Sequence, residues 1–183
     1  MAAHPKVRFK AEHIWQAPDD DKRYEVIDGD LYVTPAPSWS HQRVLMRLSF
    51  ALASWVFPRR LGEITLAPTG VVLDPETGVE PDLLYIARER ADIISQRGVE
   101  GPPDLVVEVL SPSTEARDRG IKMTRYAAAG IAHYWLVNVE AQTLEAYELG
   151  EGGYEPGGAY GRSAAFEPKL FPGLRIAIDD LWA

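Results

Sequence analysis

The sequence predicts an α/β protein with a mixed β-sheet flanked by helices and an added N-terminal β-hairpin. Two observations predict this class. The run from residue 104 to 110 is almost continuously apolar, as in a central strand buried on both faces of a sheet. From residue 40 the elements follow the order helix, strand, strand, strand, helix, strand, which is typical of helices packed on a mixed sheet. With 183 residues, the chain fits a single domain over 1–183.

The composition limits the chemistry. The chain has 19 Lys and Arg, 27 Asp and Glu, and no cysteine. It therefore excludes a thiolate nucleophile, a disulfide scaffold and Cys-ligated metals, so any metal must be held by oxygen or imidazole. The acidic balance argues against nucleic-acid binding over the whole surface but allows a local basic channel. Without a membrane-spanning segment or the apolar core of a signal peptide, we expect a cytoplasmic protein with no membrane partner.

The first elements are an arm, a hairpin and a long helix. Residues 1–22 are polar and form an N-terminal arm or short helix. Residues 23–34 are β-rich on both sides of Asp28-Gly29, a dipeptide suited to a type I′ turn, and predict a hairpin. After a loop, residues 41–57 predict a helix, with Ser38 or Ser40 as N-cap and Pro58 at its end. Its apolar positions repeat every 3.6 residues, at Val44, Leu45, Leu48, Leu52, Trp55 and Val56.

The middle of the chain predicts a second hairpin and then a central strand. Residues 63–73 and 79–86 are strand-like and flank the turn sequence 74–78. Residues 87–103 contain charged positions and a Gly-Pro-Pro break, which favour a short surface helix and loop. The buried strand 104–110 follows.

The last third continues the sheet. Residues 114–129 predict a helix, and 133–138 with 143–149 predict a buried strand and its hairpin partner. The six glycines between residues 150 and 161 indicate a flexible loop, bounded at 150–165. The tail 170–182 supplies a last strand or short helix. The core of the domain is expected over 40–139.

Two carboxylates interrupt apolar strands and need a counter-charge. Glu108 lies within the central strand, where an ionised carboxylate costs several kcal/mol unless it is paired or binds a metal. Asp82 lies in the preceding apolar run. If the register brings both side chains to one face, they form a site for a hard cation, with the Val109 carbonyl as a backbone ligand. Mg²⁺ suits such an all-oxygen site, and Mn²⁺ is its substitute.

The helix after this strand is locally basic. At 100° per residue, Asp118, Lys122 and Arg125 fall on one stripe of it, with Arg117 and Arg119 nearby. These arginines are candidates for binding flanking phosphates.

The order and spacing of several strings resemble a known family. Pro81-Asp82 followed by Glu108-Val109-Leu110 resembles the PD-(D/E)XK, restriction-endonuclease-like nucleases. More narrowly, the chain from about residue 20 to 182 is similar to the Uma-type restriction endonuclease family through RYEVIDGDLYV, SWSHQ, VEPDLLYI, GPPDLVVEVLSPSTEARDRGIKMTRYAAAG and HYWLVN.

This resemblance implies a magnesium-dependent endonuclease that hydrolyses phosphodiester bonds of DNA. It implies Asp82 and Glu108 as metal ligands and a lysine that orients or activates the attacking water. The position usually held by that lysine is Leu110, so the resemblance assigns its role to Lys122, a lysine migrated to the adjacent helix. The alternative is an inactive nuclease-fold module that binds DNA or protein.

Two residues have a weaker claim on the site. His41 lies on the core face of the long helix and is a candidate substrate-binding residue, although a structural histidine at a helix start is the commoner case. Glu25 is a possible additional carboxylate of the site, or else a solvated strand residue or a partner of Arg23. For Glu108 the alternative is a buried ion pair with Lys122 or an arginine. For Lys122 the alternative is an exposed partner of Asp118 on the same helix. The apolar hairpin and tail also suggest a homodimer.

Overall fold

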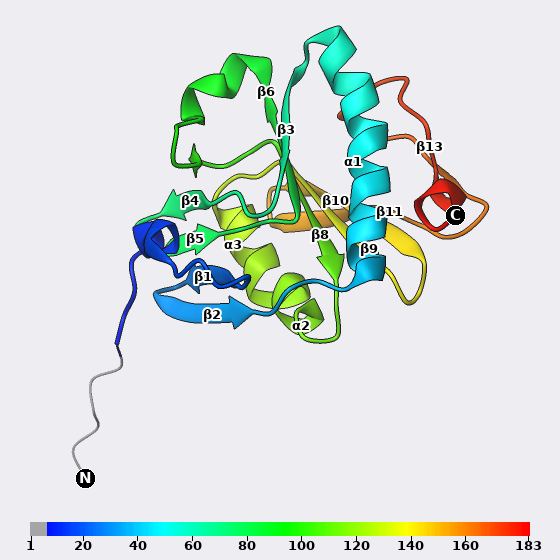
Figure 1. The fold of residues 1–183 in the computed structure, drawn as a ribbon. Coiled ribbons are helices and arrows are strands. Elements are labelled where there is room, and N and C mark those ends of the chain that lie inside the picture. The colour runs from blue at the N-terminus through cyan, green and yellow to red at the C-terminus, as the bar shows by residue number, and fades with distance from the viewer. Residues whose placement is uncertain (1–6) are drawn as a thin grey trace.

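A computed structural model describes residues 7–183 and contains two main sheets packed against each other (Figure 1). The larger sheet has six strands in the order β11-β10-β9-β8-β6-β3. Its strands are β3 (Gly62–Leu66), β6 (Leu83–Ala87), β8 (Leu105–Leu110), β9 (His133–Asn138), β10 (Thr143–Gly150) and β11 (Gly153–Tyr160). Strands β8 and β9 run parallel and the other neighbours antiparallel, so the sheet is mixed as the sequence predicts.

The smaller sheet has five strands in the order β2-β1-β5-β4-β7. They are β1 (Arg23–Ile27), β2 (Asp30–Thr34), β4 (Val71–Asp74), β5 (Thr77–Val79) and β7 (Val99–Glu100). The predicted N-terminal hairpin is confirmed as β1 and β2, and both Asp28 and Gly29 in its turn have positive φ. A short pair, β12 (Ala165–Phe166) and β13 (Ile176–Ala177), lies near the C-terminus.

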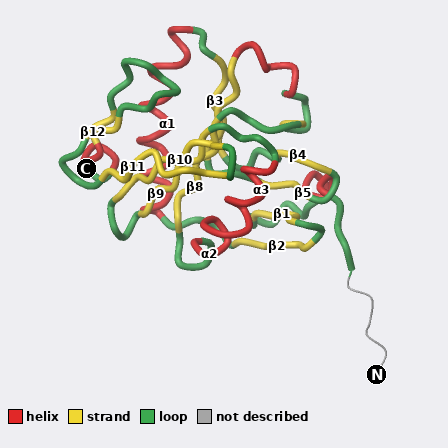
Figure 2. The backbone as a smooth tube through the Cα atoms, turned by 180° about the vertical axis from the view of Figure 1, so that it is seen from behind, coloured by secondary structure: helices red, strands yellow, loops and turns green. Residues whose placement is uncertain are grey.

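Helices cover both faces of the larger sheet (Figures 1 and 2). The longest, α1 (Trp39–Arg59), is capped by Ser38, whose hydroxyl accepts from the His41 N–H, and it continues past Pro58 into its last turn. On the opposite face lies one helical segment with three parts, namely α2 (Glu115–Arg117), a π-helical stretch (Asp118–Lys122) and α3 (Met123–Ala128). Short 3₁₀-helices occupy Ala11–Gln16, Arg88–Ile93 and Ile178–Leu181. Within 7–183 no helix is long and apolar enough to cross a membrane.

The larger sheet separates two apolar clusters. One packs α1 and the C-terminal tail onto the sheet and includes Leu48, Val107 and Trp135. The other fills the space between the sheet, the α2–α3 segment and the smaller sheet, and includes Val106 and Tyr126. Every residue of β8 is therefore buried, which confirms the central strand predicted from its apolar run.

Two expected strands are each divided between the sheets. The predicted strand 63–73 is β3 in one sheet and β4 in the other, and the predicted strand 79–86 is β5 and β6. Pro68 and Pro81 lie in the two crossing segments, where a residue without an N–H cannot continue a sheet. The crossing at residues 80–82 places Asp82 just before β6 rather than inside a strand.

The Gly-rich segment is also different from the prediction. Residues 153–160 form β11, an edge strand paired along its length with β10, and not a loop. Pairing with a preformed neighbour outweighs the weak strand preference of glycine. The N-terminal arm is partly helical at 11–16, and the portion of it before residue 7 lies outside the described residues.

Candidate active site

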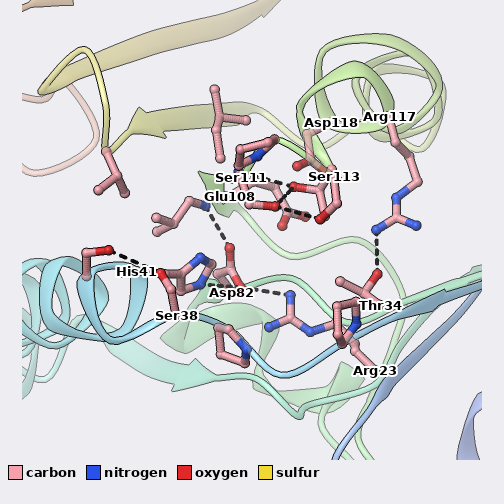
Figure 3. A pocket seen from close by; sticks show the side chains of 18 of the residues that line it. Arg23, Thr34, Ser38, His41, Asp82, Glu108, Ser111, Ser113, Arg117 and Asp118 are labelled. Atoms are coloured by element: carbon pink, nitrogen blue, oxygen red, sulfur yellow. Dashed lines mark hydrogen bonds and ion pairs between the residues drawn. The ribbon is translucent and has the colours of Figure 1, made fainter.

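A pocket of about 210 Å³ opens where β8 ends, between the two sheets and the N-terminus of α1 (Figure 3). Its walls come from the end of β8 with the Ser111–Thr114 loop, the residues before β6, the start of α1, the β1–β2 hairpin, the α2 and π-helical segment, and the residues after β9. The side chains of Asp82, Glu108 and Lys122 all line it. The pocket therefore gathers three residues that are far apart in the sequence.

The pairing of β6 with β8 brings the two carboxylates together. Leu83 is paired with Val107 in this antiparallel ladder, so Asp82 and Glu108 stand opposite each other one residue beyond it. Directly opposed residues of an antiparallel pair project to the same face. Asp82 Oδ2 accepts from the Val109 N–H at 2.7 Å, which fixes its side chain against β8.

Asp82 is buried but kept ionised by cationic and polar neighbours. Its Oδ1 accepts from Arg23 Nη1 at 2.8 Å and lies 3.2 Å from His41 Nε2. Burial opposes the charged form, but the His41 hydrogen bond and the Arg23 charge outweigh it and lower the pKa of Asp82 to about 2. His41 thus lies at the site, as the sequence placed it on the inward face of the helix, and in Figure 3 its ring points toward Asp82.

Glu108 has the opposite electrostatic balance. Its Oε1 accepts from the Tyr126 hydroxyl at 2.7 Å and lies 2.6 Å from Lys122 Nζ. The pKa of Glu108 is nevertheless raised to about 8. Burial is the main cause, and the repulsion of nearby carboxylates, including Asp82, adds to it, so that together they outweigh the attraction of Lys122. Additional positive charge at this position would therefore stabilise the ionised form.

Lys122 is almost fully buried between carboxylates. Besides Glu108, its Nζ donates to Glu25 Oε1 at 2.8 Å and lies 3.6 Å from Asp118 Oδ1. Burial disfavours the ammonium, but the charges of Glu108, Glu25 and Asp118 raise the pKa of Lys122 above its ordinary value. Lys122 is consequently a fixed positive charge and not a base at neutral pH.

Glu25 belongs to the same buried network. Although burial opposes its charge, Lys122 and Arg117 hold the pKa of Glu25 below its ordinary value. Its Oε2 lies 3.3 Å from Arg117 Nη2, and that guanidinium also donates to Thr34 Oγ1 at 2.8 Å. The alternative of a solvated Glu25 is wrong, because Glu25 is buried. The guanidinium of Arg23, its other suggested partner, forms its ion pair with Asp82.

Comparison with known proteins shows the family and the fold of this chain. A family model described as Uma2, "Putative restriction endonuclease", matches residues 11–179. The chain belongs to the Uma2 family. No match is found among curated proteins. Among solved structures, a "putative nuclease belonging to DUF820" from Anabaena variabilis has the same fold, with a TM-score of 0.79 and 19% identity over 95% of this chain and 97% of that one.

In this Uma2-family protein, two of the predicted phosphate-binding arginines lie away from the pocket. Arg119 forms a bidentate pair with Glu145, at 2.7 Å for both contacts, and Arg125 pairs with Asp28. Arg117, by contrast, lines the pocket (Figure 3). The predicted stripe assumed a regular α-helix, whereas a π-helical stretch at 118–122 changes the angle at which the later residues project.

Sequence reasoning missed two residues that act on the carboxylates. Arg23 contacts Asp82 and Tyr126 contacts Glu108, from elements 59 and 18 residues away in the chain. No local pattern distinguishes them, since an arginine at the start of a hairpin and a tyrosine in a helix are ordinary residues. Only the packing of these elements reveals their role.

The oxygen ligands of the pocket fit a hard divalent cation that is bound by only a few protein groups. Asp82 and Glu108 both present carboxylate oxygens to the pocket. The ionised form of Glu108 is disfavoured there by burial and by neighbouring negative charge. Among residues 7–183, no cluster of three or more Asp, Glu and His side chains is arranged to hold a metal. Mg²⁺ is commonly bound by one or two carboxylates with several waters, so this site would suit it.

Proposed function

We propose that this Uma2-family protein is an endonuclease that hydrolyses phosphodiester bonds of DNA with the help of Mg²⁺, for which Mn²⁺ can substitute. The observation that carries the proposal is the meeting of Asp82 and Glu108 in one pocket beside the buried ammonium of Lys122. Two acidic ligands for a cation and a fixed positive charge are the parts that phosphodiester hydrolysis requires. Membership of a family described as restriction endonucleases supports the same reaction class.

The metal would be held by the carboxylates of Asp82 and Glu108 and by the Val109 carbonyl. When bound, such a cation lowers the pKa of water and offsets the charge of phosphate oxygens. The protein residues prepare the site for it. Arg23, His41 and the Val109 N–H keep Asp82 ionised and fixed in direction.

Lys122 would act through its charge. Because its ion pairs with Glu25 and Glu108 raise its pKa, it remains protonated at neutral pH and cannot take a proton from water. A buried ammonium is most effective where negative charge increases, as on the phosphate oxygens of the transition state. We therefore assign Lys122 to transition-state stabilisation, with Glu25 as the residue that positions it.

The remaining basic residues of the pocket would bind the substrate. Arg117 and His41 line the same pocket, and Arg23 also lines it beside Asp82. A planar guanidinium such as that of Arg117 suits phosphate oxygens. This local group of basic residues would allow a protein with 27 acids and 19 bases to bind a polyanion.

The proposal is tested by nicking of supercoiled plasmid with Mg²⁺ or Mn²⁺. We expect Asp82→Asn and Glu108→Gln to reduce the rate at least about a hundredfold, the scale of losing a transition-state contact. The matched control is Asp104→Asn. Asp104 is also a carboxylate beside β8, but it accepts from the Ala87 N–H and from Arg90, and it is not a pocket residue.

Metal binding separates this function from a binding module that lacks activity. Calorimetric titration with Mn²⁺ should show one site in the wild type and in Asp104→Asn, and a large loss of affinity in Glu108→Gln. No cleavage of DNA together with no Mn²⁺ binding would reject the nuclease and favour the binding module. Cleavage that is equal in wild type and Asp82→Asn would show that the activity comes from elsewhere.

A further inference from the structure

The outward face of α1 is apolar. Trp39, Met46, Phe50 and Phe57 are 82%, 63%, 73% and 49% exposed, and they are half of the exposed large apolar residues in 7–183. With 3.6 residues per turn, their four side chains project within about 20° of one line. We call these four residues the α1 stripe. It runs along about 27 Å of helix, on the side opposite the core residues Leu48 and Leu52.

This pattern is unusual for a surface helix. A helix on the surface of a globular protein normally places polar residues opposite its core face, and a helix that is apolar on both faces is normally buried. The two arginines in the middle of α1 are held away from the stripe. Arg43 donates to the Trp182 and Ala183 carbonyls, and Arg47 donates to the Asp180 carbonyl at 2.9 Å, so both side chains are drawn toward the C-terminal segment.

The spacing within the stripe is symmetric about Leu48. Trp39 and Phe57 are nine residues before and after it, and Met46 and Phe50 are two residues before and after it. In an antiparallel pair of identical helices with a twofold axis level with Leu48, Trp39 would therefore meet Phe57 of the second copy and Met46 would meet its Phe50. Such self-complementarity is the property of an isologous interface, in which residue i contacts j and j contacts i.

We propose that the α1 stripe is a homodimer interface, occupied by the same stripe of a second copy in antiparallel orientation. Aromatic side chains bury about 150–250 Å² each, so the stripe offers roughly 500–600 Å² per copy. Doubled, this approaches the lower limit of about 1,200 Å² for stable interfaces, and the residues flanking the helix would complete it. An apolar patch of this size on a monomer usually marks a binding surface.

The charges of α1 are compatible with this pairing. The helix contains no acidic residue, and its arginines avoid each other across the proposed axis. In the antiparallel register, Arg43 stands opposite Ala53 of the second copy and Arg47 stands opposite its Ser49. No like charges meet, whereas a parallel pair in the same register would set each arginine against its own copy.

The hairpin and tail are weaker candidates for a dimer contact. The tail is used in the protein's own core, where Phe171, Ile178 and Leu181 are buried. On the hairpin, Leu31 and Val33 of β2 are exposed at 41% and 47%, a smaller apolar area than the α1 stripe. Leu31 therefore provides a matched control for substitutions on α1.

The first test measures the mass of the full chain by light scattering at tens of micromolar. The wild type and Leu31→Asp should have twice the 20.3 kDa chain mass, and Phe50→Asp should have the mass of one chain. Circular dichroism verifies that each variant is folded. A monomeric wild type, a Phe50→Asp variant that stays dimeric, or a dimer lost only in Leu31→Asp would each overturn the proposal and leave the stripe to another partner.

The second test determines the register. Because the chain has no cysteine, any disulfide that forms must join the introduced cysteines. Met46→Cys and Phe50→Cys, mixed in equal amounts and oxidised, should give about tenfold more covalent dimer than either variant alone, since a disulfide requires Cα atoms closer than about 7 Å. Equal cross-linking by either variant alone, or none in the mixture, would overturn the antiparallel arrangement. Neither readout depends on the proposed nuclease activity.

Discussion

Removing the Lys122 ammonium tests the buried charge network most directly. The side chain is only 1% exposed, and its Nζ lies 2.6 Å from Glu108 Oε1, 2.8 Å from Glu25 Oε1 and 3.6 Å from Asp118 Oδ1. Replacement by methionine keeps an unbranched chain of similar length and creates little cavity. The variant Lys122→Met therefore isolates the loss of charge, and it leaves three buried carboxylates without their common partner.

The magnitude follows from that burial. Breaking a buried ion pair by removing one partner costs about 3–5 kcal/mol, because the remaining charge stays desolvated. Domains have a total stability of about 5–15 kcal/mol, so this is a large fraction of it. At about 2–4 °C per kcal/mol for a chain of this size, the melting temperature should fall by roughly 6–20 °C.

Urea unfolding followed by tryptophan fluorescence measures the effect, since the chain has five tryptophans. The control is Lys169→Met, which removes a surface ion pair with Glu148 at 3.0 Å and should cost about 0–1 kcal/mol. Neutralising one carboxylate in the double variant Lys122→Met with Glu25→Gln should recover part of the loss. A loss below about 1 kcal/mol in Lys122→Met would refute the buried network.

The sign of the pH dependence gives a further check on this variant. Lys122 is the strongest of the neighbours that lower the pKa of Glu25, so without it the folded pKa of Glu25 would be higher than in the wild type. At a given acidic pH the folded variant would therefore bind more protons than the folded wild type. The loss of stability in Lys122→Met should therefore become smaller as the pH is lowered toward the pKa of a glutamate carboxyl in the unfolded chain. A deficit that grows on acidification would contradict this reasoning.

Three further predictions concern other contacts. Arg23→Gln removes a charge-assisted hydrogen bond to Asp82 and should slow plasmid nicking about tenfold or more, and an unchanged rate would show that Asp82 does not need this cation. Arg119 holds the pKa of Glu145 below its ordinary value, so Glu145→Gln should lower the free energy of unfolding by about 0.5–1 kcal/mol at pH 7. This cost should decrease as the pH falls through the lowered pKa. Urea unfolding at pH 7 and pH 3 measures both values. Gly130 has φ of 83° with open space around it, so Gly130→Ala should cost about 1 kcal/mol from backbone strain alone, and a neutral effect in the same assay would contradict the left-handed turn.

Local patterns were sufficient where one element carries its own signal. The 3.6-residue repeat and the Ser38 cap predict α1, and Asp28-Gly29 predicts the β1–β2 turn. The apolar run of β8 predicts a strand buried on both faces. In each case the determining interactions are within the segment, or depend only on its being buried.

Patterns failed where pairing partners decide the structure. The glycines of 153–160 predict a loop, yet β10 provides a full ladder of backbone partners and makes them a strand. The runs 63–73 and 79–86 look continuous in the sequence, but each serves two different sheets. Strand register and sheet membership depend on distant segments, which local propensity does not describe.

The sequence by itself determined the two carboxylates that need a counter-charge, since Asp82 and Glu108 interrupt apolar runs, and it singled out Lys122 and the inward-facing His41. Tertiary structure alone decided how these charges are balanced. It buried Glu25 against Lys122 across 97 residues and brought Arg23 to Asp82 across 59. The physical reason is that burial and neighbouring charge, which set each pKa and each ion pair, are properties of packed elements and not of any single segment.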